Sequence, residues 1–301
     1  MSRRGHFHGN FKYSLMFVLC VWFIQTSYGG NKLDARINRR GCGVSEPMGR
    51  VYNGNRIRKP QIPWIVEIRI MVDSRHGYLC AGSIISHNVI LTAAHCIDYK
   101  PPPKKVEIYY NTTKPSNGPV TRVVRFMKHP NYDQYHAQKY DVALLKVEDK
   151  IRFDRFVRPI CLPKRHFRID GKKLMSGGWG IINNREPSEF AKTLLYITLE
   201  AMSHQACDEI LSHITGDWGV LDSKFVLCAK TNSSTLCKGD SGAPVTMIQD
   251  NRKSVQLGVH SLGISCDKRG IFVFTIRVYK FMPWIKKTLR DPESWDTLPA
   301  A

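Results

Sequence analysis

The chain has 301 residues, of which 43% are hydrophobic, and a formal net charge of +20. It contains no internal repeat, low-complexity stretch or nucleic-acid-binding motif, so repeat proteins and nucleic-acid-binding proteins are not expected. The positive charge indicates attraction to polyanionic glycans of the heparin type or to other acidic surfaces. Solvated charge that has no partner is the plain alternative.

The first 29 residues predict a secretory signal peptide. Three basic residues precede an apolar run at 15–24, and Ser27 and Gly29 are small residues at the spacing that signal peptidase requires. The alternative is a membrane anchor, which needs ~20 apolar residues, roughly twice the length of this run. We therefore expect cleavage after Gly29 and a secreted, extracellular protein with no membrane span.

Short alternating or apolar runs recur after residue 50 and predict β-strands, because clusters of Pro, Gly, Asn and Asp separate them. The expected strands span residues 64–72, 83–91, 106–110, 120–127, 143–147, 255–263 and 271–278. Their spacing predicts an all-β domain. Residues 281–290 have apolar side chains at helical spacing and a basic end, which predicts a helix. The tail at 291–301 is expected to be loose.

Three local motifs carry side chains suited to acyl transfer. His95 stands in Leu-Thr-Ala-Ala-His-Cys, Asp141 in Tyr-Asp-Val-Ala-Leu-Leu, and Ser241 in Cys-Lys-Gly-Asp-Ser-Gly-Ala-Pro. A serine hydroxyl is a weak nucleophile until a base takes its proton, and a carboxylate can hold that base in the required tautomer. Each residue alone has a plainer interpretation, as a solvated histidine, a strand-end cap or a turn residue. Three matches in this order favour catalysis.

These motifs, in the chain order His, Asp, Ser, resemble those of the chymotrypsin/trypsin-like serine proteases across residues 50 to 290. The resemblance implies two packed six-stranded antiparallel β-barrels with a C-terminal helix and the site in the cleft between them. It makes Ser241 the nucleophile, His95 the general base and Asp141 the orienting carboxylate. The backbone N–H groups of Gly239 and Ser241 would form the oxyanion hole, where such donors contribute about 3–4 kcal/mol. No cofactor is expected.

The cysteines predict a disulfide framework. Of nine, Cys20 would leave with the signal peptide, and an even number in a secreted chain favours disulfide bonds. The resemblance implies the pairs Cys42–Cys161, Cys80–Cys96, Cys207–Cys228 and Cys237–Cys266. No C-x-x-C or H-E-x-x-H spacing occurs, so no metal site is expected. Glycosylation sequons begin at Asn111 and Asn232, which predicts a glycoprotein.

The segment Arg-Val-Tyr-Asn-Gly that begins at Arg50 resembles the activation site of the family. Cleavage after Arg50 by a trypsin-like protease would free the α-amino group of Val51, and this cation would pair with the Asp240 carboxylate. An ordinary arginine in a linker is the alternative. The bridge between Cys42 and Cys161 would keep the propeptide attached. The expected parts are a signal peptide (1–29), an activation propeptide (30–50), a peptidase domain (51–290) and a C-terminal tail (291–301).

The substrate pocket differs from the trypsin type. Thr235 stands where trypsin-type enzymes have an aspartate, and the neighbouring Leu236 is apolar, so strong preference for Arg or Lys is not expected. Phe272 replaces a glycine that keeps the pocket open, and an aromatic ring buries about 150–250 Å². Ser261 and Gly263 retain the strand that binds the substrate backbone. We predict a shallow or occluded pocket that prefers small apolar residues. A shifted alignment would instead permit a chymotrypsin-like preference.

Two function classes follow. The intact triad favours a secreted, monomeric serine endopeptidase, made as a zymogen, that acts on a protein or peptide substrate. The blocked-looking pocket and Ala243 leave open a weakly active or non-catalytic homologue that acts by binding in a protease cascade. The family usually has glycine at Ala243, and alanine would cost about 1 kcal/mol there if the residue needed a positive φ. His260, behind the pocket, would favour an acidic substrate residue when protonated, or is a buried structural histidine.

Overall fold

The computed structural model describes residues 36–45, 62–73, 76–133, 138–183, 188–214, 222–231, 236–263, 271–291 and 294–298. All of them belong to one compact unit that extends from residue 33 to the end of the chain. The predicted signal peptide lies outside the described residues, as do both residues of the predicted activation site, Arg50 and Val51.

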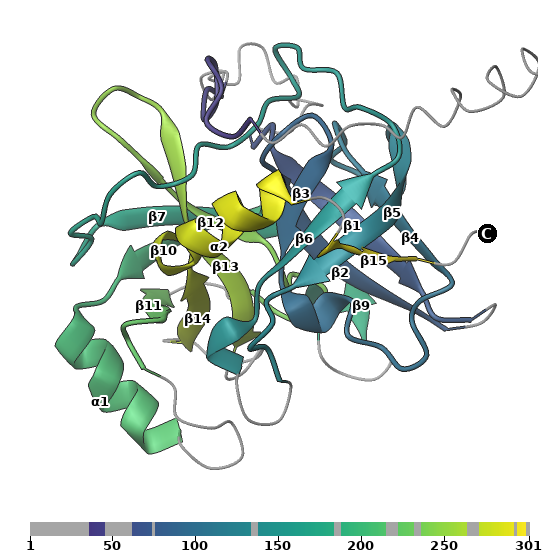
Figure 1. The fold of residues 1–301 in the computed structure, drawn as a ribbon. Coiled ribbons are helices and arrows are strands. Elements are labelled where there is room, and N and C mark those ends of the chain that lie inside the picture. The colour runs from purple at the N-terminus through teal and green to yellow at the C-terminus, as the bar shows by residue number, and fades with distance from the viewer. Residues whose placement is uncertain are drawn as a thin grey trace, which may run out of the picture. The chain divides into compact units, whose positions relative to one another are not determined.

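The first half of the unit is a six-stranded barrel (Figure 1). Its strands are β1 (Ile65–Met71), β2 (Gly77–Ile84), β3 (Val89–Thr92), β4 (Lys105–Tyr109), β5 (Val120–Lys128) and β6 (Ala143–Val147). They pair in the order β5-β4-β1-β2-β3-β6, and the antiparallel pairing of β5 with β6 closes the barrel. Alternate side chains such as Ile68 and Ile70 are fully buried, as the two-residue repeat of a strand requires.

The second half is a closed barrel with strand order β10-β11-β14-β13-β12-β7. Its strands are β7 (Lys173–Gly178), β10 (Leu195–Ala201), β11 (Val226–Thr231), β12 (Pro244–Ile248), β13 (Ser254–Gly263) and β14 (Ile271–Arg277). Ile197, Leu199 and Ala201 alternate inward along β10 and join the core of this barrel. A small hairpin of β8 (Ile181–Asn183) and β9 (Glu189–Phe190) and a helix, α1 (His204–Ile214), complete this half.

The two barrels and the C-terminal helix confirm the predicted fold class. The expected strand at 83–91 is wrong in detail, because β2 ends at Ile84 and β3 begins at Val89. Between them the backbone turns, and Ile85 N donates to Val89 O at 3.0 Å. Buried apolar residues on both sides of the turn make the two strands look like one run. Strands β7, β10, β11 and β12 were not predicted.

The C-terminal region is more ordered than the sequence indicates. Helix α2 (Val278–Arg290) begins three residues before the predicted start, and its inner face buries Phe281 and Ile285. The expectation of a loose tail is wrong, because strand β15 (Asp296–Thr297) pairs with β5 in the first barrel (Figure 1). Trp295 is buried just before β15, and its indole N–H donates to Thr288 O at 3.0 Å.

Candidate active site

His95 occupies a short 3-10 helix, η1 (Ala94–Cys96), that follows β3. Its neighbours Ala94 and Cys96 are fully buried, and the Cys80–Cys96 disulfide bond ties the helix to β2. The His95 side chain keeps 36% of its surface exposed. The buried neighbours therefore fix the backbone while the imidazole remains accessible.

Asp141 lies two residues before the start of β6 and binds His95 through both carboxylate oxygens. Oδ1 accepts the backbone N–H of His95 at 2.8 Å, and Oδ2 lies 2.7 Å from His95 Nδ1. The hydroxyl of Ser261 on β13 donates to Oδ2 at 2.6 Å. The carboxylate is almost fully buried. These contacts fix the ring orientation and leave Nε2 as the nitrogen that can take a proton.

His95 and Asp141 shift each other's pKa in opposite directions. Burial alone would lower the pKa of His95, but the charge of Asp141 and the hydrogen bond to it outweigh burial and raise the pKa above its usual 6.5. Burial alone would raise the pKa of Asp141, but the His95 charge and the hydrogen bonds from His95 and Ser261 lower it below 3.8. Asp141 is therefore ionised at neutral pH.

Ser241 lies in a tight turn before β12 that is joined to the first barrel. Ala81 N on β2 donates to Ser241 O at 2.7 Å, and Cys96 Sγ lies 3.6 Å from the same oxygen. The next residue, Gly242, has φ +83°, and a Cβ there would stand 2.1 Å from Thr92 Oγ1. Only glycine permits this approach. The turn therefore holds Ser241 next to Cys96, the residue that follows His95.

The turn also presents two backbone donors on either side of Asp240. Gly239 has φ +96°, and Asp240 N donates back to Cys237 O at 2.9 Å. Within the described parts of the chain, neither Gly239 N nor Ser241 N donates to another group. Two such N–H groups in one turn suit an oxyanion.

The Asp240 carboxylate is buried among backbone N–H groups. Gly180 N donates to Oδ1 at 2.7 Å and Cys237 N to Oδ2 at 2.9 Å. A Cβ at Gly178 or Gly180 would stand 2.0 Å or 2.4 Å from a carboxylate oxygen, which explains the glycines on both sides of Trp179. Burial raises the pKa of Asp240 to about 6, although the two N–H donors oppose the shift. No cation faces this carboxylate in the part of the chain that the structure describes.

The predicted pocket residues lie in different places. Leu236 is buried in the core of the second barrel, whereas Phe272 and Leu262 pack against the cluster around the Cys207–Cys228 disulfide bond. Gly263 pairs with Val273 of β14. Thr235 lies outside the described residues. The contact between Ser261 and Asp141 was not predicted from the sequence, because 120 residues separate them.

Two neighbours of the site differ from the expectations attached to them. Ala243 does not have a positive φ and is fully buried, so it carries no backbone strain of the kind that glycine relieves. Burial lowers the pKa of His260 to about 3, and its Nδ1 has no hydrogen-bond partner among the described residues. His260 is therefore uncharged at neutral pH, which does not support recognition of an acidic side chain by a protonated imidazole.

Three disulfide bonds lie where the resemblance implies them. The structure contains the disulfide bonds Cys42–Cys161, Cys80–Cys96 and Cys207–Cys228. Cys237 is disulfide-bonded too, and its expected partner Cys266 lies outside the described residues. Asn111, the first sequon position, is partly exposed with φ +53°, and Asn232 lies outside the described residues.

None of the described helices is long and apolar enough to span a membrane.

Comparisons with known proteins identify the family of this chain. Residues 51–285 match the model of the family described as Trypsin. The chain is 28% identical over 256 residues to transmembrane protease serine 9 of Rattus norvegicus, covering 83% of this chain and 23% of that protein. It is 27% identical over 277 residues to the phenoloxidase-activating enzyme of Bombyx mori, covering 82% and 63%. A CLIP domain-containing serine protease B8 of Anopheles gambiae is 25% identical over 299 residues, covering 87% and 72%. The chain thus spans less than two thirds of the length of the first two relatives.

Proposed function

Because this chain belongs to the trypsin family, we propose that it is a secreted serine endopeptidase that hydrolyses peptide bonds. Ser241 is the nucleophile, His95 the general base and Asp141 the carboxylate that orients it. The observation that carries this proposal is the double contact between Asp141 and His95. One carboxylate oxygen accepts the backbone N–H of His95 and the other lies against ring Nδ1, so both the position of the residue and the orientation of its imidazole are fixed. A single hydrogen bond would leave the ring free to pivot.

The reaction follows from these positions. Ser241 Oγ bonds to the carbonyl carbon of the substrate while its proton passes to His95 Nε2, and Asp141 stabilises the imidazolium. The carbonyl oxygen becomes an oxyanion that accepts hydrogen bonds from the backbone N–H groups of Gly239 and Ser241. The C–N bond then breaks, and the leaving nitrogen takes the proton from His95. Water attacks the ester by the same steps, which releases the acid and restores the serine.

We also propose that the chain is a zymogen. A buried carboxylate without a countercharge is costly, and Asp240 has none among the described residues. Cleavage after Arg50 would supply the α-ammonium group of Val51 as that countercharge and stabilise the oxyanion turn. The Cys42–Cys161 disulfide bond would keep the propeptide attached after cleavage.

The proposed preference is for a small apolar residue before the scissile bond. Phe272 supports it, because this ring and Leu262 are both partly buried against the cluster around Cys207–Cys228, on the strand pair that the family uses for its pocket. One relative is named for activating another enzyme, phenoloxidase, which supports a place for this chain in a protease cascade. Turnover of a peptide library would test the preference, and fast cleavage after Arg or Phe would contradict it.

The proposed activity is tested by labelling with a fluorophosphonate probe before and after cleavage at Arg50. We expect labelling only after cleavage and none in Ser241→Ala, because the probe requires an activated serine and a formed oxyanion hole. Labelling before cleavage would contradict the zymogen proposal alone. No labelling after verified cleavage would contradict the catalytic proposal and favour a homologue that acts by binding.

A further inference from the structure

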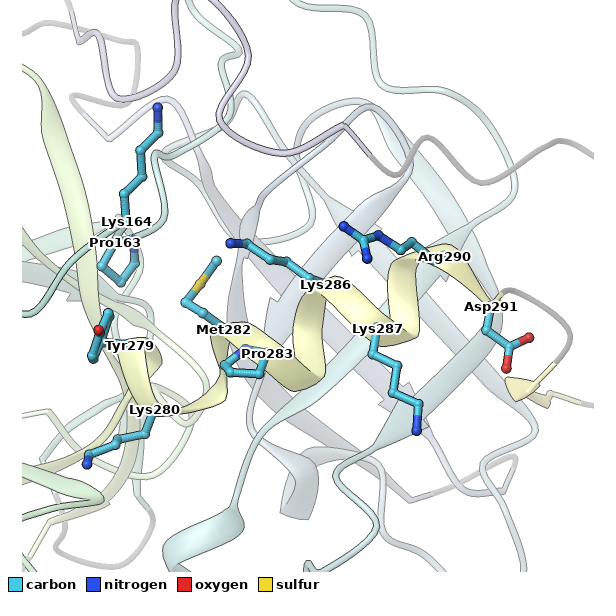
Figure 2. A pocket seen from close by; sticks show the side chains of 10 residues that line it. All are labelled: Pro163, Lys164, Tyr279, Lys280, Met282, Pro283, Lys286, Lys287, Arg290 and Asp291. Atoms are coloured by element: carbon cyan, nitrogen blue, oxygen red, sulfur yellow. The ribbon is translucent and has the colours of Figure 1, made fainter.

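Five cations gather on a hollow beside helix α2. The hollow has a volume of about 780 Å³, and Figure 2 shows its side chains. Lys280, Lys286, Lys287 and Arg290 come from α2, and Lys164 comes from the segment before β7. All five side chains are exposed. The inner face of α2 is buried in the protein core, so the charges of the helix can only project outward.

A second hollow, of about 410 Å³, adjoins the first at Lys164, which lines both. Its other cations are Arg39, Arg40, Arg165 and Lys253. Three separate segments supply them. The Cys42–Cys161 disulfide bond holds the first segment against the second.

Backbone contacts fix these segments side by side. Gly43 N donates to Pro159 O at 2.8 Å, and Ser254 N donates to Gly43 O at 2.8 Å. Asn38 exchanges two hydrogen bonds with the backbone of Leu162, at 2.6 and 3.0 Å. The cations therefore occupy a preformed surface, which we call the basic groove: the two hollows with their nine cations.

The described residues that line the basic groove leave most of its positive charge uncompensated, because Asp291 is the only one of them that carries a carboxylate. Arg39 aside, none of the nine cations forms an ion pair within the described chain. Cations elsewhere do pair, as Arg69 does with Glu67 at 2.7 Å. A concentrated positive field of this kind attracts anions and raises their association rate.

We propose that the basic groove binds a sulfated polysaccharide chain. A single small anion would occupy only one of the two hollows, whereas a linear polyanion can cross both and contact the cations in series. The hollowed surface does not suit a flat membrane. Tyr279 and Pro283 line the first hollow and Phe167 the second, which gives sugar rings apolar surface between the charged contacts. Arg and Lys side chains form charge-assisted hydrogen bonds to the oxygens of sulfate groups.

The groove is independent of the proposed catalytic site, because it shares no residue with the triad or the oxyanion turn. It would also survive activation, because the disulfide bond retains Arg39 and Arg40 after cleavage at Arg50.

The test measures binding of a size-fractionated heparin oligosaccharide to the full chain carrying Ser241→Ala, which removes self-cleavage. One variant replaces Lys286, Lys287 and Arg290 by Gln in the first hollow, and a second replaces Arg40, Arg165 and Lys253 by Gln in the other. Gln has a helix propensity close to that of Lys and Arg, so α2 is retained. We expect each triple variant to bind roughly tenfold more weakly and to show a smaller dependence on salt concentration.

The matched control replaces Lys104, Lys150 and Arg152 by Gln, three exposed cations outside both hollows. It removes the same charge and should retain binding within about twofold. Equal losses in the control would overturn the proposal in favour of net charge. If only one of the two triple variants lost heparin binding, the proposal that one polysaccharide chain crosses both hollows would be overturned. Equally tight binding to single-stranded DNA or to phosphatidylserine vesicles, with the same dependence on the groove, would overturn the assignment to a sulfated glycan.

Discussion

His95 and Asp141 are joined by two contacts that use both carboxylate oxygens, one at the backbone N–H and one at ring Nδ1. The first contact fixes where the histidine stands, and the second fixes how its ring is turned. Because the same carboxylate also accepts the Ser261 hydroxyl, it cannot rotate without losing bonds to three donors. This arrangement determines several expected behaviours of the protein.

The activity should depend on pH through His95. The neighbouring Asp141 raises the pKa of His95 above 6.5, and a general base must be neutral to accept a proton. We therefore expect kcat/KM of the cleaved enzyme to rise with pH, with an inflection above 6.5. Asp141→Asn removes the countercharge and should lower that inflection and reduce kcat roughly 10⁴-fold. An unchanged inflection in Asp141→Asn would contradict this role.

Ser261→Ala should weaken catalysis by misplacing Asp141. A hydrogen bond to a charged group contributes about 1.5–3 kcal/mol, so we expect kcat/KM to fall roughly tenfold or more. Ser261→Thr keeps the hydroxyl and should recover part of the loss. Ser83→Ala removes another buried hydroxyl, bonded to Gln256 at 2.6 Å, and serves as the control for a change in stability alone. Equal effects of Ser261→Ala and Ser83→Ala on the pH profile would argue against positioning.

The uncleaved chain should become more stable as the pH falls from about 6 to about 4. The pKa of Asp240 is about 6 in the folded chain against 3.8 for an ordinary aspartate, so the folded form takes up a proton first and the cost of the buried charge is lost. This pKa difference corresponds to about 3 kcal/mol at most. Urea unfolding of Ser241→Ala, with and without Asp240→Asn, isolates this contribution. After cleavage at Arg50 the contribution should disappear, because the carboxylate would then be paired.

Ala243→Gly should not improve catalysis. Ala243 does not have a positive φ and its methyl group is fully buried, so glycine removes that methyl group and increases the entropy of the unfolded chain. We expect the free energy of unfolding to fall by about 0.5–1 kcal/mol, with kcat/KM unchanged. Urea titration and peptide turnover measure the two quantities. A several-fold gain in kcat/KM would restore the idea that alanine impairs the site.

Trp295→Ala should destabilise the protein substantially. Trp295 is buried beside strand β15 and donates to Thr288 O of helix α2, so truncation leaves a cavity and removes one of the two hydrogen bonds that this carbonyl accepts. We expect a loss of roughly 3 kcal/mol or more in the free energy of unfolding. The exposed neighbour Asp296→Ala is the control and should change it by less than about 0.5 kcal/mol. A small effect of Trp295→Ala would mean that the tail contributes little to the fold in solution.

Sequence motifs alone marked His95, Asp141 and Ser241, because each stands in its own short pattern. Apolar runs such as 143–147 predicted strands well, since both faces of those strands are buried. Strand β10 was not predicted. Only alternate residues are buried in it, and exposed Leu195 and Tyr196 interrupt the pattern.

The tertiary structure decided how distant residues meet. Ser261 reaches Asp141 across 120 residues, and Gly180 reaches Asp240 across 60. The tail pairs with β5, and the basic groove combines segments that lie far apart in the chain. Local patterns reflect the burial and backbone preference of neighbouring residues, whereas these contacts depend on how the barrels close. Closure is a property of the packed chain, so it determined the contacts that support the proposed triad, the burial of Asp240 away from any cation among the described residues, and the clustering of the cations.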